Sequence, residues 1–184
     1  MGMPALKIED FPYYTYDDYV QWEGQWEIIK GIPYAMTPAP SPKHQRISLK
    51  IASQLDELLS NCTDCKTYQA IDWRLTDDTV VQPDVLVVCG SGIEGNTLTV
   101  PPVLAVEILS PSTSRKDKFL KHRLYEHEGV KYYCIVDPDS NHAIMFHIGD
   151  NQYRQLEDFK DGKITMEIGK CLIEFDFAKV FKEL

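Results

Sequence analysis

The chain has 184 residues, enough for a sizeable core, and its 43% hydrophobic and 26% charged residues are ordinary for a globular protein. We therefore expect residues 1–184 to form a single domain. The net charge of −9 argues against non-specific attraction to a polyanion, although it leaves room for a local basic surface.

No run approaches the roughly 18 consecutive apolar residues of a membrane span, so no membrane partner is expected. The first residues lack a basic region followed by an apolar one, which is the pattern of a secretory signal. A cytoplasmic location is therefore the expectation.

The first third of the chain predicts two helices and a hairpin. Residues 13–22 are typical of a short aromatic-rich helix, and residues 25–36 carry β-forming residues around a Lys-Gly turn. A proline-rich connector, 37–42, breaks regular structure. Ser41 is then placed to cap a helix that has proline at its first position, and apolar residues at helical spacing predict that helix over 42–60.

Three strand-like segments follow, at residues 66–75, 80–88 and 101–109. The last two are apolar almost throughout, which fits strands covered by helices on both faces. Residues 110–129 predict a helix with Ser and Thr capping candidates before it and Gly129 at its C-terminal end.

The rest of the chain predicts further strands. Residues 130–138 indicate a buried strand, and residues 142–148 indicate an outer strand with a hairpin partner at 151–157. The tail, 171–181, is typical of a strand or a short helix packed on the core. Together these elements predict one α/β domain.

The five cysteines are odd in number and scattered. Cys62 and Cys65 form a CxxC motif, which can bind zinc or carry redox chemistry. Because no second pair and no histidine pair nearby completes a tetrahedral site, we expect reduced, buried thiols instead.

Two carboxylates stand out in the apolar segments. Asp84 follows Pro83 at the start of a strand, where both residue types are also common for purely structural reasons. Glu107 is the only charge within residues 103–109, and burying an unpaired carboxylate costs several kcal/mol. If their strands pair, about 4.8 Å apart, the two carboxylates converge and repel each other unless one is protonated or a cation lies between them. Carboxylate oxygens on rigid strands suit Mg²⁺ or Mn²⁺.

At this point the sequence resembles a known family. The segments WEIIKG, PAPSPKHQRIS and QPDVLVV, and the run from Glu107 to Pro138, are similar to the Uma-two family of the PD-(D/E)XK nuclease superfamily. The similarity spans roughly residues 12–180. It implies a restriction-endonuclease-like fold, in which helices flank a mixed central sheet and a hairpin is added at the N-terminus.

The resemblance also implies a metal site. Asp84 matches the aspartate of the family's PD motif and Glu107 its second acidic ligand, while the carbonyl of Ile108 would be a further ligand. Glu27 matches a third acidic position that often helps to hold the metal. On its own, Glu27 could equally be a carboxylate on a surface strand.

Two positions depart from the pattern that this resemblance sets. The superfamily places a lysine two residues after the glutamate, where this chain has Leu109; the family instead has a lysine on the following helix, which Lys121 matches. Lys30 stands where the family often has an acid before the turn glycine.

Several other polar residues keep two interpretations. His44 and Gln45 match a family His-Gln pair but could also serve as local helix caps. Asp117 and Lys121 are four residues apart, so they share a helix face either as part of the site or as a surface ion pair. The other four histidines show no partner by spacing and are interpreted as ordinary polar residues.

The leading hypothesis is an endonuclease that uses Mg²⁺ or Mn²⁺ to hydrolyse DNA, with Asp84, Glu107, Glu27 and Lys121 in the site. Alternatives are a non-catalytic module that binds nucleic acid or protein, and a hydrolase of small phosphodiesters. The aromatic N-terminal segment and the strand 142–148 also predict a homodimer. On the leading hypothesis, Lys121→Ala lowers cleavage at least about a hundredfold with little effect on the melting temperature.

Overall fold

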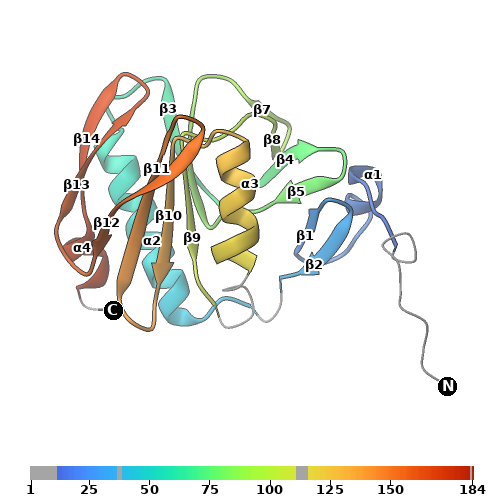
Figure 1. The fold of residues 1–184 in the computed structure, drawn as a ribbon, viewed down its shortest axis with the longest axis horizontal. Coiled ribbons are helices and arrows are strands. Elements are labelled where there is room, and N and C mark those ends of the chain that lie inside the picture. Colours follow the sequence, from blue (N-terminus) through green and yellow to red (C-terminus); the bar gives the residue numbers. More distant parts are fainter. Residues whose placement is uncertain (1–11, 37–38, 111–115, 183) are drawn as a thin grey trace.

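The computed structural model describes residues 12–36, 39–110, 116–182 and 184 (Figure 1). Within them, a six-stranded sheet in the order β12-β11-β10-β9-β6-β3 forms the centre of the molecule. β9 and β10 run parallel and the other neighbours antiparallel, so this central sheet is mixed as expected. Its strands are β3 (Cys65–Gln69), β6 (Val85–Cys89), β9 (Leu104–Ile108), β10 (Tyr132–Asp137), β11 (His142–Gly149) and β12 (Gln152–Phe159).

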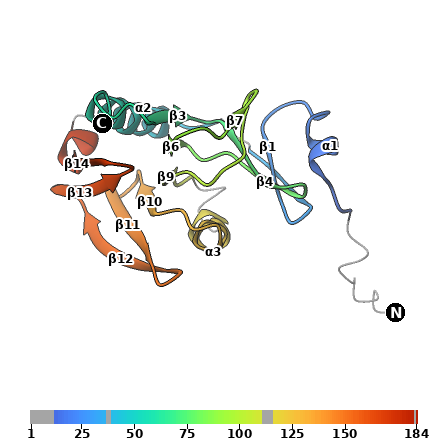
Figure 2. The ribbon, with the colours of Figure 1, turned by 90° about the horizontal axis from the view of Figure 1, so that it is seen from above.

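A second sheet, in the order β2-β1-β5-β4-β8-β7, adjoins the first and includes the expected N-terminal hairpin. The hairpin turn consists of Lys30 and Gly31, both with positive φ (51° and 74°), as a two-residue turn between twisted strands requires. The strands are β1 (Trp26–Ile29), β2 (Ile32–Ala35), β4 (Asp72–Thr76), β5 (Thr79–Val81), β7 (Ile93–Glu94) and β8 (Thr97–Leu98). The short helix α1 (Tyr16–Tyr19) lies beside the hairpin in both views (Figures 1 and 2).

Two expected strands are each divided between the sheets. Segment 66–75 becomes β3 and β4, with Ala70 in the left-handed region between them (φ 47°), and segment 80–88 becomes β5 and β6. The prediction of continuous strands was therefore wrong at residues 82–84, where the chain crosses between sheets. Asp84 stands at that crossing.

The long helix α2 (Pro42–Leu58) begins where the sequence predicts, because the Ser41 side chain accepts a hydrogen bond from the backbone N–H of His44 (3.2 Å). The helix expected over 110–129 is a π-helix, η2 (Lys116–Lys121), continued by α3 (His122–His127). Gly129 follows its end with φ 74°, as predicted. The Ser and Thr capping candidates at 112–114 lie outside the described residues.

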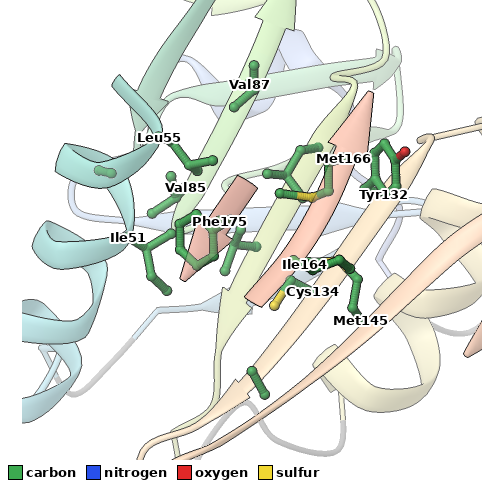
Figure 3. Packing of buried hydrophobic residues seen from close by; sticks show 14 of the residues in the cluster. Ile51, Leu55, Val85, Val87, Tyr132, Cys134, Met145, Ile164, Met166 and Phe175 are labelled. Carbon is green, nitrogen blue, oxygen red and sulfur yellow. The ribbon is translucent and has the colours of Figure 1, made fainter. Parts of the chain in front are cut away.

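Both faces of the central sheet are covered, α2 on one side and α3 on the other (Figure 2). Alternation along β6 sends Val85 and Val87 to the α2 side and Leu86 and Val88 to the α3 side. Figure 3 shows the α2 side, where helix, central sheet and C-terminal strands meet in one hydrophobic cluster. These contacts fix the strand ends that position the acidic residues.

The C-terminal segment adds a separate two-stranded sheet of β13 (Lys163–Ile168) and β14 (Cys171–Asp176), followed by α4 (Phe177–Phe181). The tail thus contains both a strand and a short helix, and β13 is an element that sequence reasoning missed. The segment 142–148 has its expected hairpin partner, β12. The prediction of an outer strand at 142–148 was wrong, because β12 takes the edge of the sheet.

Four of the five cysteines form disulfides, Cys62–Cys171 and Cys65–Cys89, and only Cys134 is a free, buried thiol. The expectation of reduced thiols was wrong for these four, because strand pairing and the β13–β14 turn bring distant cysteines together.

Burial raises the pKa of the Cys134 thiol to about 12. Since persistent disulfides are uncommon in a reducing cytosol, these two bonds count against the expected cytoplasmic location.

None of the described helices has both the length and the apolar character needed to cross a membrane.

Candidate active site

Asp84 and Glu107 are brought together by the pairing of β6 with β9. The antiparallel register joins Val85 to Val106, and continuing it by one residue places Asp84 opposite Glu107. The backbone N–H of Ile108 donates to Asp84 Oδ2 (2.7 Å), which ties this carboxylate to the neighbouring strand. The pairing therefore places the two residues opposite each other on neighbouring strands, as the expected convergence requires.

Lys121 lies at the centre of the site, between two buried carboxylates. Its Nζ is 2.7 Å from Glu27 Oε1 and 2.8 Å from Glu107 Oε1. Only 2% of Lys121 is exposed, against 0% of Glu27 and 3% of Glu107. This contact joins the end of η2 to β1 and β9. Lys121 is therefore not merely one partner of a surface ion pair with Asp117.

Two further groups hold these carboxylates in place. The hydroxyl of Tyr125 donates to Glu107 Oε1 (2.6 Å), and the backbone N–H of Gln82 donates to Glu27 Oε1 (2.9 Å). Burial, followed by the nearby Glu107 carboxylate, raises the pKa of Tyr125 well above its usual range, so the phenol stays protonated as a donor.

His44 belongs to the same region, and Gln45 does not. His44 is buried, with Nε2 3.3 Å from Asp84 Oδ2. The Gln45 side chain instead donates to the backbone carbonyl of Pro40 (3.2 Å), which is the local capping alternative. The first turn of α2 therefore borders the site through the His44 side chain.

The donor set is compatible with a divalent cation. Three carboxylates and one ammonium, in their ordinary charge states, leave a formal charge of −2 at Glu27, Asp84, Glu107 and Lys121. Mg²⁺ is commonly held by one or two carboxylates and several waters. Among the described side chains no cluster of three or more His, Cys, Asp or Glu is arranged as a ligand set, so the fit depends on two carboxylates together with a backbone oxygen.

The carbonyl of Ile108 is suited to supply that oxygen. In a β-strand the N–H and C=O of one residue point to the same side. Because the Ile108 N–H points to Asp84, its carbonyl also lies on the Asp84 side of β9. That the metal ligands are Asp84, Glu107 and Ile108 stays a prediction.

The two departures from the family pattern have different consequences. Leu109 is buried in the α3-side cluster with Tyr125, so residue 109 places no ammonium in the site, whereas Lys121 does. Lys30 is exposed in the β1–β2 turn and takes no part in the site. Asp117 lies in η2, and its side chain is outside the described part of the chain.

Sequence reasoning missed Tyr125 and Gln82. The spacing of four residues between Lys121 and Tyr125 puts both on one helix face, so this signal was present in the sequence. The backbone contact of Gln82 had no such signal, because it depends on how β5 leaves the second sheet.

Comparison with solved structures identifies the fold. The crystal structure of a protein from Anabaena variabilis, described as a "putative nuclease", matches with a TM-score of 0.74 at 18% identity over 91% of this chain and 97% of that chain. The mixed sheet, its covering helices and this match define a restriction-endonuclease-like fold.

Comparison of sequences identifies the family. A sequence model of a protein family, described as "Uma2: Putative restriction endonuclease", matches residues 16–168 of this chain. An uncharacterized protein of Synechocystis sp. (strain ATCC 27184 / PCC 6803 / Kazusa) is 30% identical over 150 residues, which cover 77% of each chain. The chain belongs to the Uma2 family, the Uma-two family of the resemblance above. That membership groups it with nuclease-type hydrolases.

Proposed function

We propose that this chain is an endonuclease that hydrolyses DNA phosphodiester bonds with the help of Mg²⁺ or Mn²⁺. The observation that carries the proposal is the buried contact of Lys121 with Glu27 and Glu107, beside the strand-anchored Asp84. These four charged side chains come from four segments of the chain: β1, the crossing between β5 and β6, β9 and η2. Such a costly arrangement is typical of a functional site.

Asp84, Glu107 and the Ile108 carbonyl would hold the cation, and Glu27 would orient Lys121. When bound, the divalent cation would supply Lewis-acid stabilisation and favour deprotonation of the attacking water. The oxygen of that water would bond to phosphorus as the bond to the leaving oxygen breaks, while the proton that the water loses passes to solvent and the leaving oxygen takes up a proton from solvent. The Lys121 ammonium is placed to stabilise the negative charge that develops on the phosphate oxygens.

Tyr125 and His44 would act as positioning residues. Tyr125 fixes one oxygen of Glu107, and His44 restricts the carboxylate of Asp84 from the opposite side of the strand pair. Neither residue needs to touch the substrate for this role.

Metal binding is tested by calorimetric titration with Mn²⁺. We expect a site that weakens sharply in Asp84→Asn and in Glu107→Gln. Asp56→Asn is the matched control, because Asp56 is an exposed carboxylate on α2, well along the helix from His44. Equal affinity in the wild type and both site variants would remove the assignment of the ligands.

Activity is tested on plasmid DNA with and without Mg²⁺. Cleavage that requires the cation and disappears in Asp84→Ala supports the proposal, whereas binding of DNA without cleavage identifies a non-catalytic module. The remaining alternative is a hydrolase of small phosphodiesters, and comparing cleavage of DNA with hydrolysis of a chromogenic phosphodiester distinguishes it from an endonuclease. Hydrolysis of that ester but not of DNA would assign the site to small phosphodiesters.

A further inference from the structure

A pocket unrelated to the acidic site lies between α1 and the β1–β2 hairpin, which are neighbours in Figures 1 and 2. Its volume is about 430 Å³, large enough for a small organic molecule. The residues that line it are Tyr14, Gln21, Trp22, Glu23, Trp26 and Pro33. Adjacent residues of a strand point to opposite faces, so Trp26 lines this pocket while Glu27 faces the acidic site.

The aromatic walls stand at steep angles to one another. The ring of Trp22 meets that of Tyr14 at 81°, with the centroids 5.1 Å apart, and that of Trp26 at 63° and 5.4 Å. Rings arranged in this way present their faces in different directions. A cation is attracted to the electron-rich face of an aromatic ring, and three aromatic residues in different orientations line this one pocket.

Local hydrogen bonds hold these walls in position. The indole N–H of Trp26 donates to the backbone carbonyl of Glu23 (2.9 Å), across a turn in which Gly24 has φ 87°. The side-chain amide of Gln21 donates to the backbone carbonyl of Asp17 (2.8 Å). Gln21 and Glu23 both line the pocket, so its lining residues include an amide and a carboxylate that can accept hydrogen bonds.

The negative charge of the residues that line the pocket favours a cationic ligand. The one charged side chain in the lining is the Glu23 carboxylate, and none of the described residues that line the pocket is Lys, Arg or His. The whole chain carries −9, which further favours cations over anions such as nucleotides. Few acceptors and mostly ring surface suit a trimethylated ammonium, which has no N–H to satisfy, better than a guanidinium with five donors.

We propose that this pocket binds a trimethylammonium group, with Tyr14, Trp22 and Trp26 as the aromatic walls and Glu23 as the counter-charge. Both a small molecule and a trimethylated lysine side chain carry this group. The site is independent of the nuclease proposal, since it shares no residue with the acidic site.

Choline and its neutral analogue 3,3-dimethylbutan-1-ol test the proposal on the intact protein, because they have nearly the same shape and differ in charge. Binding is followed by tryptophan fluorescence, to which two of the three tryptophans contribute from the pocket. We expect choline to bind at least about fivefold more tightly than the alcohol. The affinity for a peptide with trimethyllysine is compared with the affinity for the same peptide with unmodified lysine. Tighter binding of the methylated peptide would show that the pocket can bind the group on a protein side chain.

Two variants assign the binding to the pocket. Glu23→Gln should weaken choline binding at least about threefold, and Trp22→Ala should weaken it further, with circular dichroism to check that the fold is retained. Glu57→Gln, an exposed carboxylate on α2, should bind as the wild type does. The proposal is overturned if neither choline nor the methylated peptide binds, if the neutral alcohol binds equally well, or if Glu23→Gln has no effect.

Discussion

Lys121 is the residue whose environment differs most from what its sequence position indicates. In a charged stretch of helix, a lysine is normally a solvated surface residue. Here its ammonium is buried against two carboxylates, so its positive charge compensates their mutual repulsion. Its role in the proposed reaction and its role in stability are consequently inseparable, and the sequence-based expectation of an unchanged melting temperature needs revision.

Lys121→Ala is expected to lower DNA cleavage at least about a hundredfold and also to destabilise the fold by about 3–5 kcal/mol. The loss of stability follows because Glu27 and Glu107 remain buried without their cation. Chemical denaturation and cleavage assays measure the two effects. Lys66→Ala, which removes an exposed lysine on β3, should leave both unchanged.

A second replacement separates the two roles of Lys121. Adding Glu27→Gln to Lys121→Ala removes one of the two uncompensated charges, so part of the stability should return while cleavage stays low. Full activity of Lys121→Ala would contradict the catalytic role. An unchanged stability of that variant would contradict the buried ion pairs.

Among the elements, α2 shows most directly how local sequence positions a site residue. Ser41 caps the helix by accepting from the backbone N–H of His44, and the side chain of that same histidine reaches Asp84. The cap therefore fixes the turn of helix that borders the acidic site. η2 has a comparable role at the other side, since it ends at Lys121. π-helical turns of this kind are frequent at functional sites.

Ser41→Ala is expected to lower the free energy of unfolding by about 1 kcal/mol, because the first turn of α2 loses its side-chain acceptor. Urea denaturation measures this change. The slope of the unfolding free energy against urea concentration should be the same in the variant and in the wild type. Ser41→Asn is the matched control, since asparagine is an equally good cap. An equal loss in both variants would show that the cap is not the cause.

In the whole molecule, the two disulfides link parts that are distant along the chain. Cys62–Cys171 spans 109 residues and ties the β13–β14 turn region to the end of α2, while Cys65–Cys89 joins the paired strands β3 and β6. Cross-links stabilise mainly by restricting the unfolded chain, and long loops gain the most. The C-terminal hairpin therefore depends on a covalent link as well as on its apolar contacts.

Alkylation of the unfolded, unreduced protein should modify one thiol of five, that of Cys134, and reduction should expose all five. The variant with Cys62→Ala and Cys171→Ala should be less stable by about 2–5 kcal/mol. Mass spectrometry and denaturation give the two measurements. Five reactive thiols before reduction would contradict the disulfides.

Self-association of the whole molecule stays a prediction, as does the single domain over residues 1–184. The cytoplasmic location is untested as well, and the two disulfides count against it. Val20 (58%), at the end of the aromatic N-terminal segment, and Ile32 (51%), in β2, are exposed apolar side chains that a second copy could cover. Light scattering should give twice the chain mass of 21.1 kDa. A value that stays at 21.1 kDa at working concentrations would reject the homodimer.

The sequence by itself determined the features that depend on neighbouring residues. Ser41 and the proline after it start a helix, Lys30 and Gly31 form a hairpin turn, and Glu107 is marked as a candidate site residue by being a charge in an apolar run. Each of these follows from local backbone preference or from the cost of burying a charge. These signals predicted the strands that carry Glu27 and Glu107 and most of the elements around them.

Only the tertiary structure decided which distant segments meet. The division of two strands between sheets, the pairing of Cys62 with Cys171, and the contact of Lys121 with Glu27 all join residues far apart in the chain. Such contacts are chosen by the burial of whole faces of the sheets, for which many arrangements share the same local preferences. For that reason the sequence indicates an acidic site, but only the packing of η2 and α3 against the sheets places a lysine and a tyrosine on its carboxylates.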